Sequence, residues 1–274
     1  MWKYALLISY HGAEFCGWQK QKELTVLPSI QSTLEQALER ITGEQCSVVG
    51  SGRTDAGVHA AGQVAHFVLK AKEWETWILQ RALNSHLPVS IRIRAVQQVP
   101  LDFHAQRSAV RKQYSYYFQQ GPSALAHLEP MSWWIYKQLD VSGMDRAIQS
   151  LKGEHDFKAF QARGSKPGST VRAMLEVDVT RIPIGFPAGL ADGFHSENNA
   201  MAFVRVRLVG TGFLKQMVRG IAGTLLQIGE SRRPVECMEE VLRSQERSKV
   251  GPTAPARALW LEKVWYPDEY RLWQ

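Results

Sequence analysis

The order of strand-like and helix-like segments in the first part of the chain limits the possible folds most narrowly. Strands are predicted at residues 2–10, 47–50, 63–69 and 91–99, and the last two alternate clearly. A helix is predicted to open at residues 28–29 and to carry Ile30, Leu34, Leu38 and Ile41 at helical spacing, and residues 74–86 suit a second helix. The order is therefore β-α-β-β-α-β, which is the ferredoxin-like unit.

The remainder of the chain repeats this order of elements. Strands are predicted at residues 112–119, 171–180, 201–209 and 258–264, and helices at 144–151, 214–228 and 234–242. No repeat is visible at the level of residues, so the duplication rests on element order alone. Residues 182–199 are rich in glycine, proline and polar residues, which predicts a long loop between two strands.

These patterns predict an α+β fold made of two ferredoxin-like halves. The boundary is expected near residues 100–107, giving an N-terminal half at 1–104 and a C-terminal half at 105–274. The two sheets would merge into one broad, mainly antiparallel sheet with helices on one face. The other face would then be free for a flat or grooved ligand.

The charge balance favours a polyanionic partner. The 274 residues include 33 Lys and Arg against 26 Asp and Glu, which gives a net charge of +7 and a pI near 9.4. Such an excess attracts nucleic acids. The signal is weak by itself, because many basic proteins bind no nucleic acid.

Cysteine usage and hydropathy indicate a cytoplasmic protein. Cys16, Cys46 and Cys237 are few, odd in number and far apart, so neither a disulfide framework nor a paired-cysteine metal site is expected. The apolar run at residues 4–8 is too short for a signal peptide, and no run approaches the length of a membrane span. Phosphate-loop, dinucleotide-binding and serine-hydrolase motifs are also missing from the sequence.

Residues 50–62, G-S-G-R-T-D-A-G-V-H-A-A-G, form the segment most suggestive of chemistry. They place Asp55 among four glycines and two residues after Arg53. A neighbouring cation keeps a carboxylate ionised, and an ionised, positioned aspartate is a plausible nucleophile. The alternative is a tight turn in which Asp55 bonds to nearby backbone N–H groups, with Arg53 in a local ion pair.

The predicted strand at residues 112–119 carries aromatic side chains at high density. Tyr114, Tyr116 and Phe118 share one face, together with Lys112. A nucleobase stacked on an aromatic ring gains about 1–3 kcal/mol. The alternative is that this face is core, which is favoured for Phe118. Tyr114 is the candidate for stacking, because a tyrosine can lie at the edge of a pocket.

Arg219 is an isolated cation in the otherwise apolar predicted helix at 214–228. A buried arginine needs a carboxylate or a phosphate as a partner, whereas a solvated one needs none. The histidines are scattered and show no metal-ligand spacing, so a metal site is not expected.

The segments that carry a family resemblance run through nearly the whole chain. The most specific are G-R-T-D-A-G-V-H-A at 52–60 and G-Q-V-A-H-F at 62–67. Others are Y-H-G at 10–12, G-W-Q-K-Q at 17–21, F-H-A at 103–105, K-Q-Y-S-Y at 112–116, H-D-F-K-A-F at 155–160, T-V-R at 170–172, F-L-K-Q-M-V-R at 213–219, A-P-A at 254–256 and Y-P at 266–267. The chain resembles the bacterial tRNA pseudouridine synthases of the TruA type.

Three positions depart from that family's pattern. His11 stands where an aspartate is usual, Gln106 where an arginine is usual, and Ala258 where a glycine is usual. None of them lies in the segment at 52–60. A change at Gln106 bears on RNA contacts and so on the range of substrates.

The resemblance implies a specific reaction. Asp55 would be the nucleophile, Arg53 and Arg219 would pair with it or steer the RNA backbone, and Tyr114 would stack on the target base. The family isomerises uridines at positions 38, 39 and 40 of the tRNA anticodon arm, acts as a homodimer, and needs neither a metal nor an organic cofactor. Its fold has two ferredoxin-like halves with a joined sheet and an active-site cleft between them.

Two other functions compete with this hypothesis. A non-catalytic RNA-binding protein on a double ferredoxin-like platform would show no turnover and no special role for Asp55. A hydrolase with an aspartate nucleophile and a small substrate would need neither the basic excess nor Tyr114, and would work without RNA.

Overall fold

The computed structural model describes residues 1–21, 26–164, 168–183 and 202–273. They form two compact units, Met1–Lys112 with Trp260–Gln274 (unit 1) and Gln113–Leu259 (unit 2). The mixed α+β class with mainly antiparallel strands is confirmed. The loop predicted at residues 182–199 falls almost entirely outside the described residues.

Unit 1 has the ferredoxin-like order that the sequence predicts. Its elements are β1 (Trp2–Tyr10), α1 (Ile30–Thr42), β2 (Val49–Gly50), β3 (His59–Leu69), α2 (Thr76–His86), β4 (Ile91–Val99) and the final strand β10 (Leu259–Trp265). Strand β1 lies between β4 and β3 and is antiparallel to both. The short β2 pairs antiparallel with Ala65 and His66, near the middle of β3, and β10 pairs parallel with His59 and Ala60 at the start of β3.

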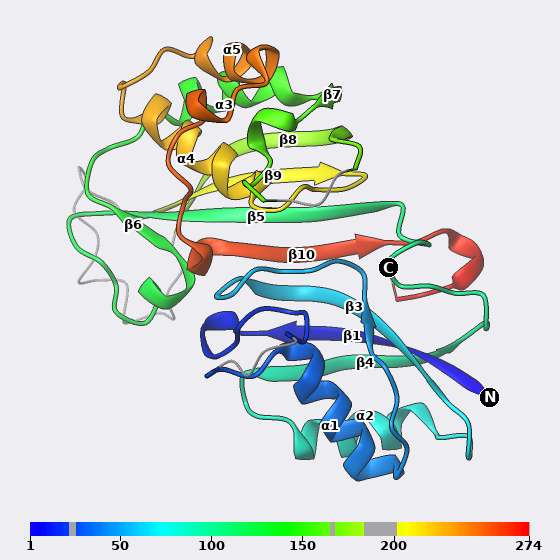
Figure 1. The fold of residues 1–274 in the computed structure, drawn as a ribbon. Coiled ribbons are helices and arrows are strands. Elements are labelled where there is room, and N and C mark those ends of the chain that lie inside the picture. The colour runs from blue at the N-terminus through cyan, green and yellow to red at the C-terminus, as the bar shows by residue number, and fades with distance from the viewer. Residues whose placement is uncertain (22–25, 165–167, 184–201, 274) are drawn as a thin grey trace. The chain divides into compact units, whose positions relative to one another are not determined.

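Local signals define the helices of unit 1. At the start of α1, Ser29 and Ser32 form a reciprocal capping box, and Gly43 ends the helix at φ 75°. The apolar face of α1 is buried at Ile30, Leu34 and Leu38, as the spacing predicts. Helix α2 contacts α1 and packs on β4, and both helices lie beside the strands of unit 1 (Figure 1).

Unit 2 has the first five elements of the same order, with additions. Its elements are β5 (Arg111–Gln120), β6 (Trp133–Ile135), α3 (Val141–Ile148), β7 (Gly153–Asp156), β8 (Val171–Pro183), β9 (Ala202–Gly210), α4 (Met217–Gly229) and α5 (Cys237–Ser244). The five shared elements are β5, α3, β8, β9 and α4, whereas the strand that would close the order, β10, belongs to unit 1. The hydrogen-bonded order is β5-β9-β8-β7, and β6 pairs parallel with β5. Helices α3, α4 and α5 contact one another and gather over β7, β8 and β9 (Figure 1).

Three features of the fold differ from the sequence expectation. Strands β6 and β7 are three and four residues long and were not predicted, because such short strands carry little periodicity. The expected halves, 1–104 and 105–274, are continuous in sequence. In the structure, residues 260–274 join unit 1, because β10 pairs with β3 there.

Short 3-10 turns connect several of these elements. They lie at Gly12–Glu14, Glu129–Met131, Gln149–Leu151, Lys158–Phe160, Arg247–Lys249, Ala256–Ala258 and Asp268–Tyr270. None of the helices in the described part of the chain is both long and apolar enough to cross a membrane.

Candidate active site

The loop that carries Asp55 connects β2 to β3 and is held from inside unit 1. Its first residue, Ser51, is fully buried, donates its backbone N–H to the Val64 carbonyl (2.7 Å), and hydrogen-bonds through its hydroxyl to Gln63 Oε1 (2.6 Å). The amide of Gln63, also fully buried, donates to the Gly52 carbonyl (3.0 Å). These bonds fix the loop start to β3.

The middle of the loop rests on the segment that precedes α1. The Thr54 carbonyl accepts from the Trp18 backbone N–H (3.1 Å), and the Thr54 hydroxyl shares a hydrogen bond of 2.8 Å with the Tyr10 phenol. Burial raises the pKa of Tyr10 to about 12, so this phenol keeps its proton at neutral pH. Gly17 has φ 104°, and a methyl group there would lie 2.7 Å from the Thr54 oxygen. The loop can therefore approach only a glycine at this position.

Asp55 itself is half-buried at a turn that the backbone closes. Its carbonyl accepts from the Val58 N–H (3.1 Å), and Gly57 takes the left-handed conformation at φ 78°. The two interpretations of this segment are thus compatible, because the turn uses the Asp55 backbone. A turn of this kind sets the direction in which the carboxylate projects.

Two glycines of this segment are needed for close packing, which the sequence alone does not reveal. A methyl group at Gly50 would overlap the Trp18 ring, and one at Gly62 would overlap the Glu262 carbonyl of β10. These two glycines therefore allow close packing inside unit 1.

Arg53 is exposed, and the structure pairs it with no carboxylate among the residues that it describes. The local Arg53–Asp55 ion pair that spacing suggested is therefore absent from the described part of the chain. A different cation touches the loop: Lys112 donates from Nζ to the Ser51 carbonyl (2.7 Å). The sequence associated Lys112 only with the aromatic strand, because the two residues are 61 positions apart.

Tyr114 lies in unit 2, on β5, and is 7% exposed. Its ring meets Phe213 edge-on, with centroids 4.9 Å apart and planes at 72°. Tyr116 and Phe118 on the same face are fully buried, which confirms the core interpretation for Phe118. The Tyr116 phenol donates to the Pro255 carbonyl (3.0 Å), and burial raises its pKa well above the usual value. A stacking role for Tyr114 stays a prediction.

Arg219 lies in the first turn of α4 and is half-buried. Its Nε donates to the Ala254 carbonyl (2.7 Å), and the Ala254 N–H donates back to the Arg219 carbonyl (3.1 Å). The Ala254 backbone thus fixes one edge of the guanidinium.

The histidines of the segments at 52–60 and 62–67 have structural contacts. His59 is fully buried, accepts the Gly12 N–H at Nδ1 (3.0 Å), and stacks on Trp260. His66 accepts the Ala105 N–H at Nδ1 (3.1 Å). Burial, together with His104, lowers the pKa of His66 to about 4, so it is neutral at physiological pH.

The three unusual residues lie in different environments. The His11 ring lies 4.5 Å from the His59 ring, centroid to centroid. Gln106 is exposed, and its backbone N–H donates to His104 Nδ1 (3.2 Å). Ala258 is fully buried. Of these, Gln106 is placed where solvent, or an RNA, can reach it.

The four expected site residues divide between the units. Asp55 and Arg53 share one loop of unit 1, whereas Tyr114 and Arg219 belong to unit 2. Ser51, Gln63 and Lys112 were not anticipated as supports of the loop. A faint signal for Gln63 exists, because it is a polar residue in a strand that is otherwise mostly apolar.

Comparison with known proteins gives a consistent result. A family model described as tRNA pseudouridine synthase matches residues 6–106 and 147–267. A tRNA pseudouridine synthase A of Bdellovibrio bacteriovorus is 38% identical over 269 residues, covering 97% of this chain and 96% of that protein. Those of Hydrogenovibrio crunogenus and Pseudomonas aeruginosa are 38% and 36% identical over 269 residues, each covering 98% of this chain and, respectively, 94% and 87% of the relative.

Proposed function

The chain belongs to the tRNA pseudouridine synthase family, and on that basis we propose that it converts uridine to pseudouridine at positions 38, 39 and 40 of the tRNA anticodon arm, with Asp55 as the nucleophile. The observation that carries the role of Asp55 is the loop itself. Its buried supports at Ser51 and Gln63 hold it in one position. Enzymes hold reacting groups in this manner, because small misplacements cost rate.

The reaction is an isomerisation. The N1–C1′ glycosidic bond breaks, the uracil turns, and a C5–C1′ bond forms. The C5 hydrogen leaves as a proton and N1 gains one, so the reaction needs no oxidant, reductant or hydrolytic water. The Asp55 carboxylate attacks either the sugar C1′ or the uracil ring, or assists by removing a proton.

The other site residues have complementary proposed roles. Tyr114 stacks on the target base. Taking a base out of its stack costs roughly a few kcal/mol, and stacking on the tyrosine ring offsets part of this cost. Arg53 is exposed and has no carboxylate partner among the described residues, which favours a contact with RNA phosphate. Arg219, fixed along one edge by Ala254, pairs with Asp55 or the RNA backbone.

The proposed context follows the family. The enzyme acts as a homodimer in the cytoplasm, on tRNA, without a metal or organic cofactor. Its net charge of +7 suits a polyanionic substrate.

Replacement of the nucleophile tests the proposal. We expect Asp55→Asn to lower tritium release from tRNA labelled at C5 of uridine by a factor of at least about 10³, because the amide cannot act as a nucleophile. Binding of tRNA should stay within a few fold. Asp102→Asn is the matched control, since Asp102 is an exposed carboxylate of the same unit. If Asp55→Asn turned over at the rate of Asp102→Asn, Asp55 could not be the nucleophile.

A further inference from the structure

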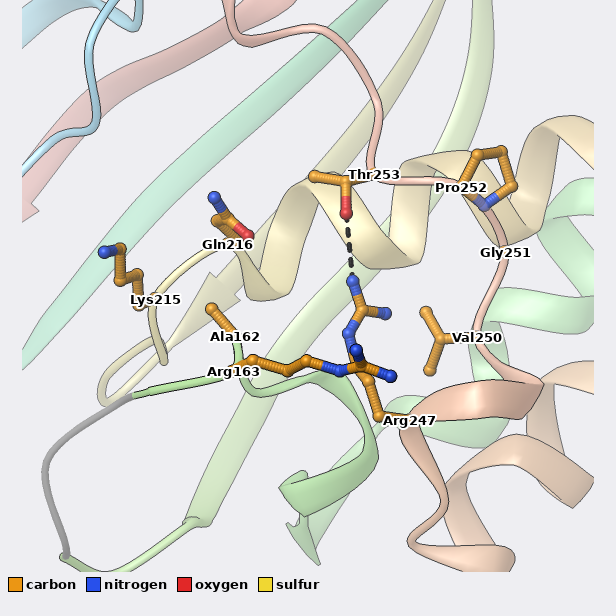
Figure 2. Close-up of a pocket in the computed structure, with 9 residues that line it drawn as sticks. All are labelled: Ala162, Arg163, Lys215, Gln216, Arg247, Val250, Gly251, Pro252 and Thr253. Carbon is orange, nitrogen blue, oxygen red and sulfur yellow. Dashed lines mark hydrogen bonds between the residues drawn. The ribbon is translucent and has the colours of Figure 1, made fainter.

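Unit 2 contains a cavity of about 460 Å³ whose lining is basic (Figure 2). Its lining residues are Ala162, Arg163, Lys215, Gln216, Arg247, Val250, Gly251, Pro252 and Thr253. Three of them carry a positive charge, and none of these described residues is an aspartate or glutamate. The cavity therefore has a formal charge of +3 that its own walls do not balance.

Two of the cations, Arg163 and Arg247, act on each other. Partial burial, and then the charge of Arg163, lowers the pKa of Arg247. Arg247 donates from Nη2 to the neutral hydroxyl of Thr253 (2.9 Å), and the structure gives neither arginine a carboxylate partner among the residues it describes. Each guanidinium has five N–H donors. The two like charges repel each other, and an anion bound between the two guanidinium groups would offset that repulsion.

The start of helix α4 adds to the positive potential. Gln216 precedes the helix at φ 60° and makes no side-chain capping bond. Arg247 lies near the first turns of this helix, because a methyl group built on Gly220 would lie 3.7 Å from Arg247 Nη1. A cation at the N-terminal end of a helix is unfavourable, because that end carries a partial positive charge. An anion bound here would interact favourably with the start of α4 and with Arg247.

Hydrogen bonds fix the walls of the cavity. Thr224 donates to the Gly220 carbonyl (2.8 Å) and accepts the Gly251 N–H (3.0 Å), which ties the loop at 250–253 to α4. On the opposite wall, the Ala162 N–H donates to the Lys215 carbonyl (3.2 Å). The cations are thus carried by a fixed frame, and Arg163 and Lys215 remain exposed at its rim.

We propose that this cavity, formed by Arg163, Lys215 and Arg247, binds a backbone phosphate of the tRNA substrate. The inference rests on the proposed function for its ligand. The exposed rim admits a strand of a macromolecule, and guanidinium groups match the geometry of phosphate oxygens. Thr253 is followed directly by Ala254, whose backbone holds Arg219. A phosphate bound in the cavity would therefore lie next to the segment that supports Arg219, which is a proposed site residue.

Charge-removing variants test the cavity. Arg163→Gln and Arg247→Gln should each weaken tRNA binding about 10- to 100-fold at low salt, since a charged hydrogen bond to phosphate is lost. Each should also reduce the slope of log affinity against log salt by about one unit. The loss should fall on KM more than on kcat. Arg146→Gln, an exposed arginine on α3, removes the same charge elsewhere and should change neither quantity.

A second measurement uses inorganic phosphate alone. Phosphate should raise the thermal unfolding midpoint of the wild type and of Arg146→Gln above that in chloride of equal ionic strength, and should not do so for the two cavity variants. Arg163 is exposed, so its variant should fold even if Arg247→Gln does not.

The outcomes separate this inference from the proposed function. Cavity variants that match Arg146→Gln in tRNA affinity and salt slope overturn the inference. Loss of the phosphate effect with an unchanged tRNA salt slope also overturns it, since the cavity then takes a free phosphate. Failure of the wild type to form pseudouridine contradicts the proposed function, whereas the binding measurements still decide the role of the cavity.

Discussion

Gln63 fixes the loop that carries Asp55 from within the sheet. Gln63 is fully buried. Replacing it with leucine removes the donor to the Gly52 carbonyl and the acceptor of the Ser51 hydroxyl. We expect Gln63→Leu to cost about 1–3 kcal/mol of stability and to lower kcat for pseudouridine formation at least about tenfold, with tRNA affinity little changed.

Asn84→Leu is the matched control for this prediction. Asn84 holds Ile93 by two hydrogen bonds, of 2.9 and 2.8 Å, in the same unit but not on the Asp55 loop. It should lower the free energy of unfolding without lowering kcat. Equal kcat values for the two variants would show that the Gln63 contacts do not position Asp55.

His66 makes the stability of the protein depend on pH. Its pKa is about 4 in the folded state, mainly because of burial, against about 6.5 in the unfolded chain. The lowered pKa means that the folded state favours the neutral imidazole. The contribution of His66 to the free energy of unfolding is therefore complete above about pH 6.5 and is lost as the pH falls towards about 4. The difference between these pKa values corresponds to about 3 kcal/mol.

Urea unfolding at about pH 7.5 and about pH 4.5 measures this effect. His66→Asn should reduce the loss of stability between the two conditions by about 2–3 kcal/mol, because the amide oxygen can accept the Ala105 N–H without titrating. The same loss in wild type and variant would mean that other groups carry the pH dependence.

At the scale of elements, the contact between α4 and the loop at 250–253 sets the position of Arg219. Gly223 lies in the middle of α4, and a methyl group there would overlap the Pro252 carbonyl. Gly223→Ala should therefore destabilise the protein by about 1–3 kcal/mol, although alanine is the better helix former. Thermal unfolding measures the loss.

Gly220→Ala serves as the control for that prediction. It lies one turn earlier in α4, and the nearest atom to its methyl group would be a Val250 side-chain carbon at 3.3 Å, which can shift. A smaller loss than for Gly223→Ala is expected. Equal losses would indicate that helix α4 tolerates no alanine at either glycine, independently of the loop.

Periodicity and residue type made most elements, and part of the candidate site, predictable. The apolar spacing of α1 and α4 and the alternation of β3 and β4 are local signals, and Asp55 stands out because of its neighbours in sequence. The roles of Ser51 and Lys112 were not predictable. Their contacts join residues 12 and 61 positions apart, which only the folded chain brings together.

At the scale of the whole molecule, the chain end returns to the first unit. The pairing of β10 with β3 could not be read from local pattern, because a parallel partner can come from any distance in sequence. The repeated element order, in contrast, was visible in the sequence. Family membership indicates tRNA as the substrate, and the basic balance of the chain suits a polyanion.

Mapping of pseudouridine in an unmodified tRNA transcript tests the central claim most directly. Wild-type protein should introduce pseudouridine only at positions 38, 39 and 40 where uridine occurs, and Asp55→Asn should introduce none. New pseudouridine at other positions, or an equal yield from the two proteins, would contradict the proposed function.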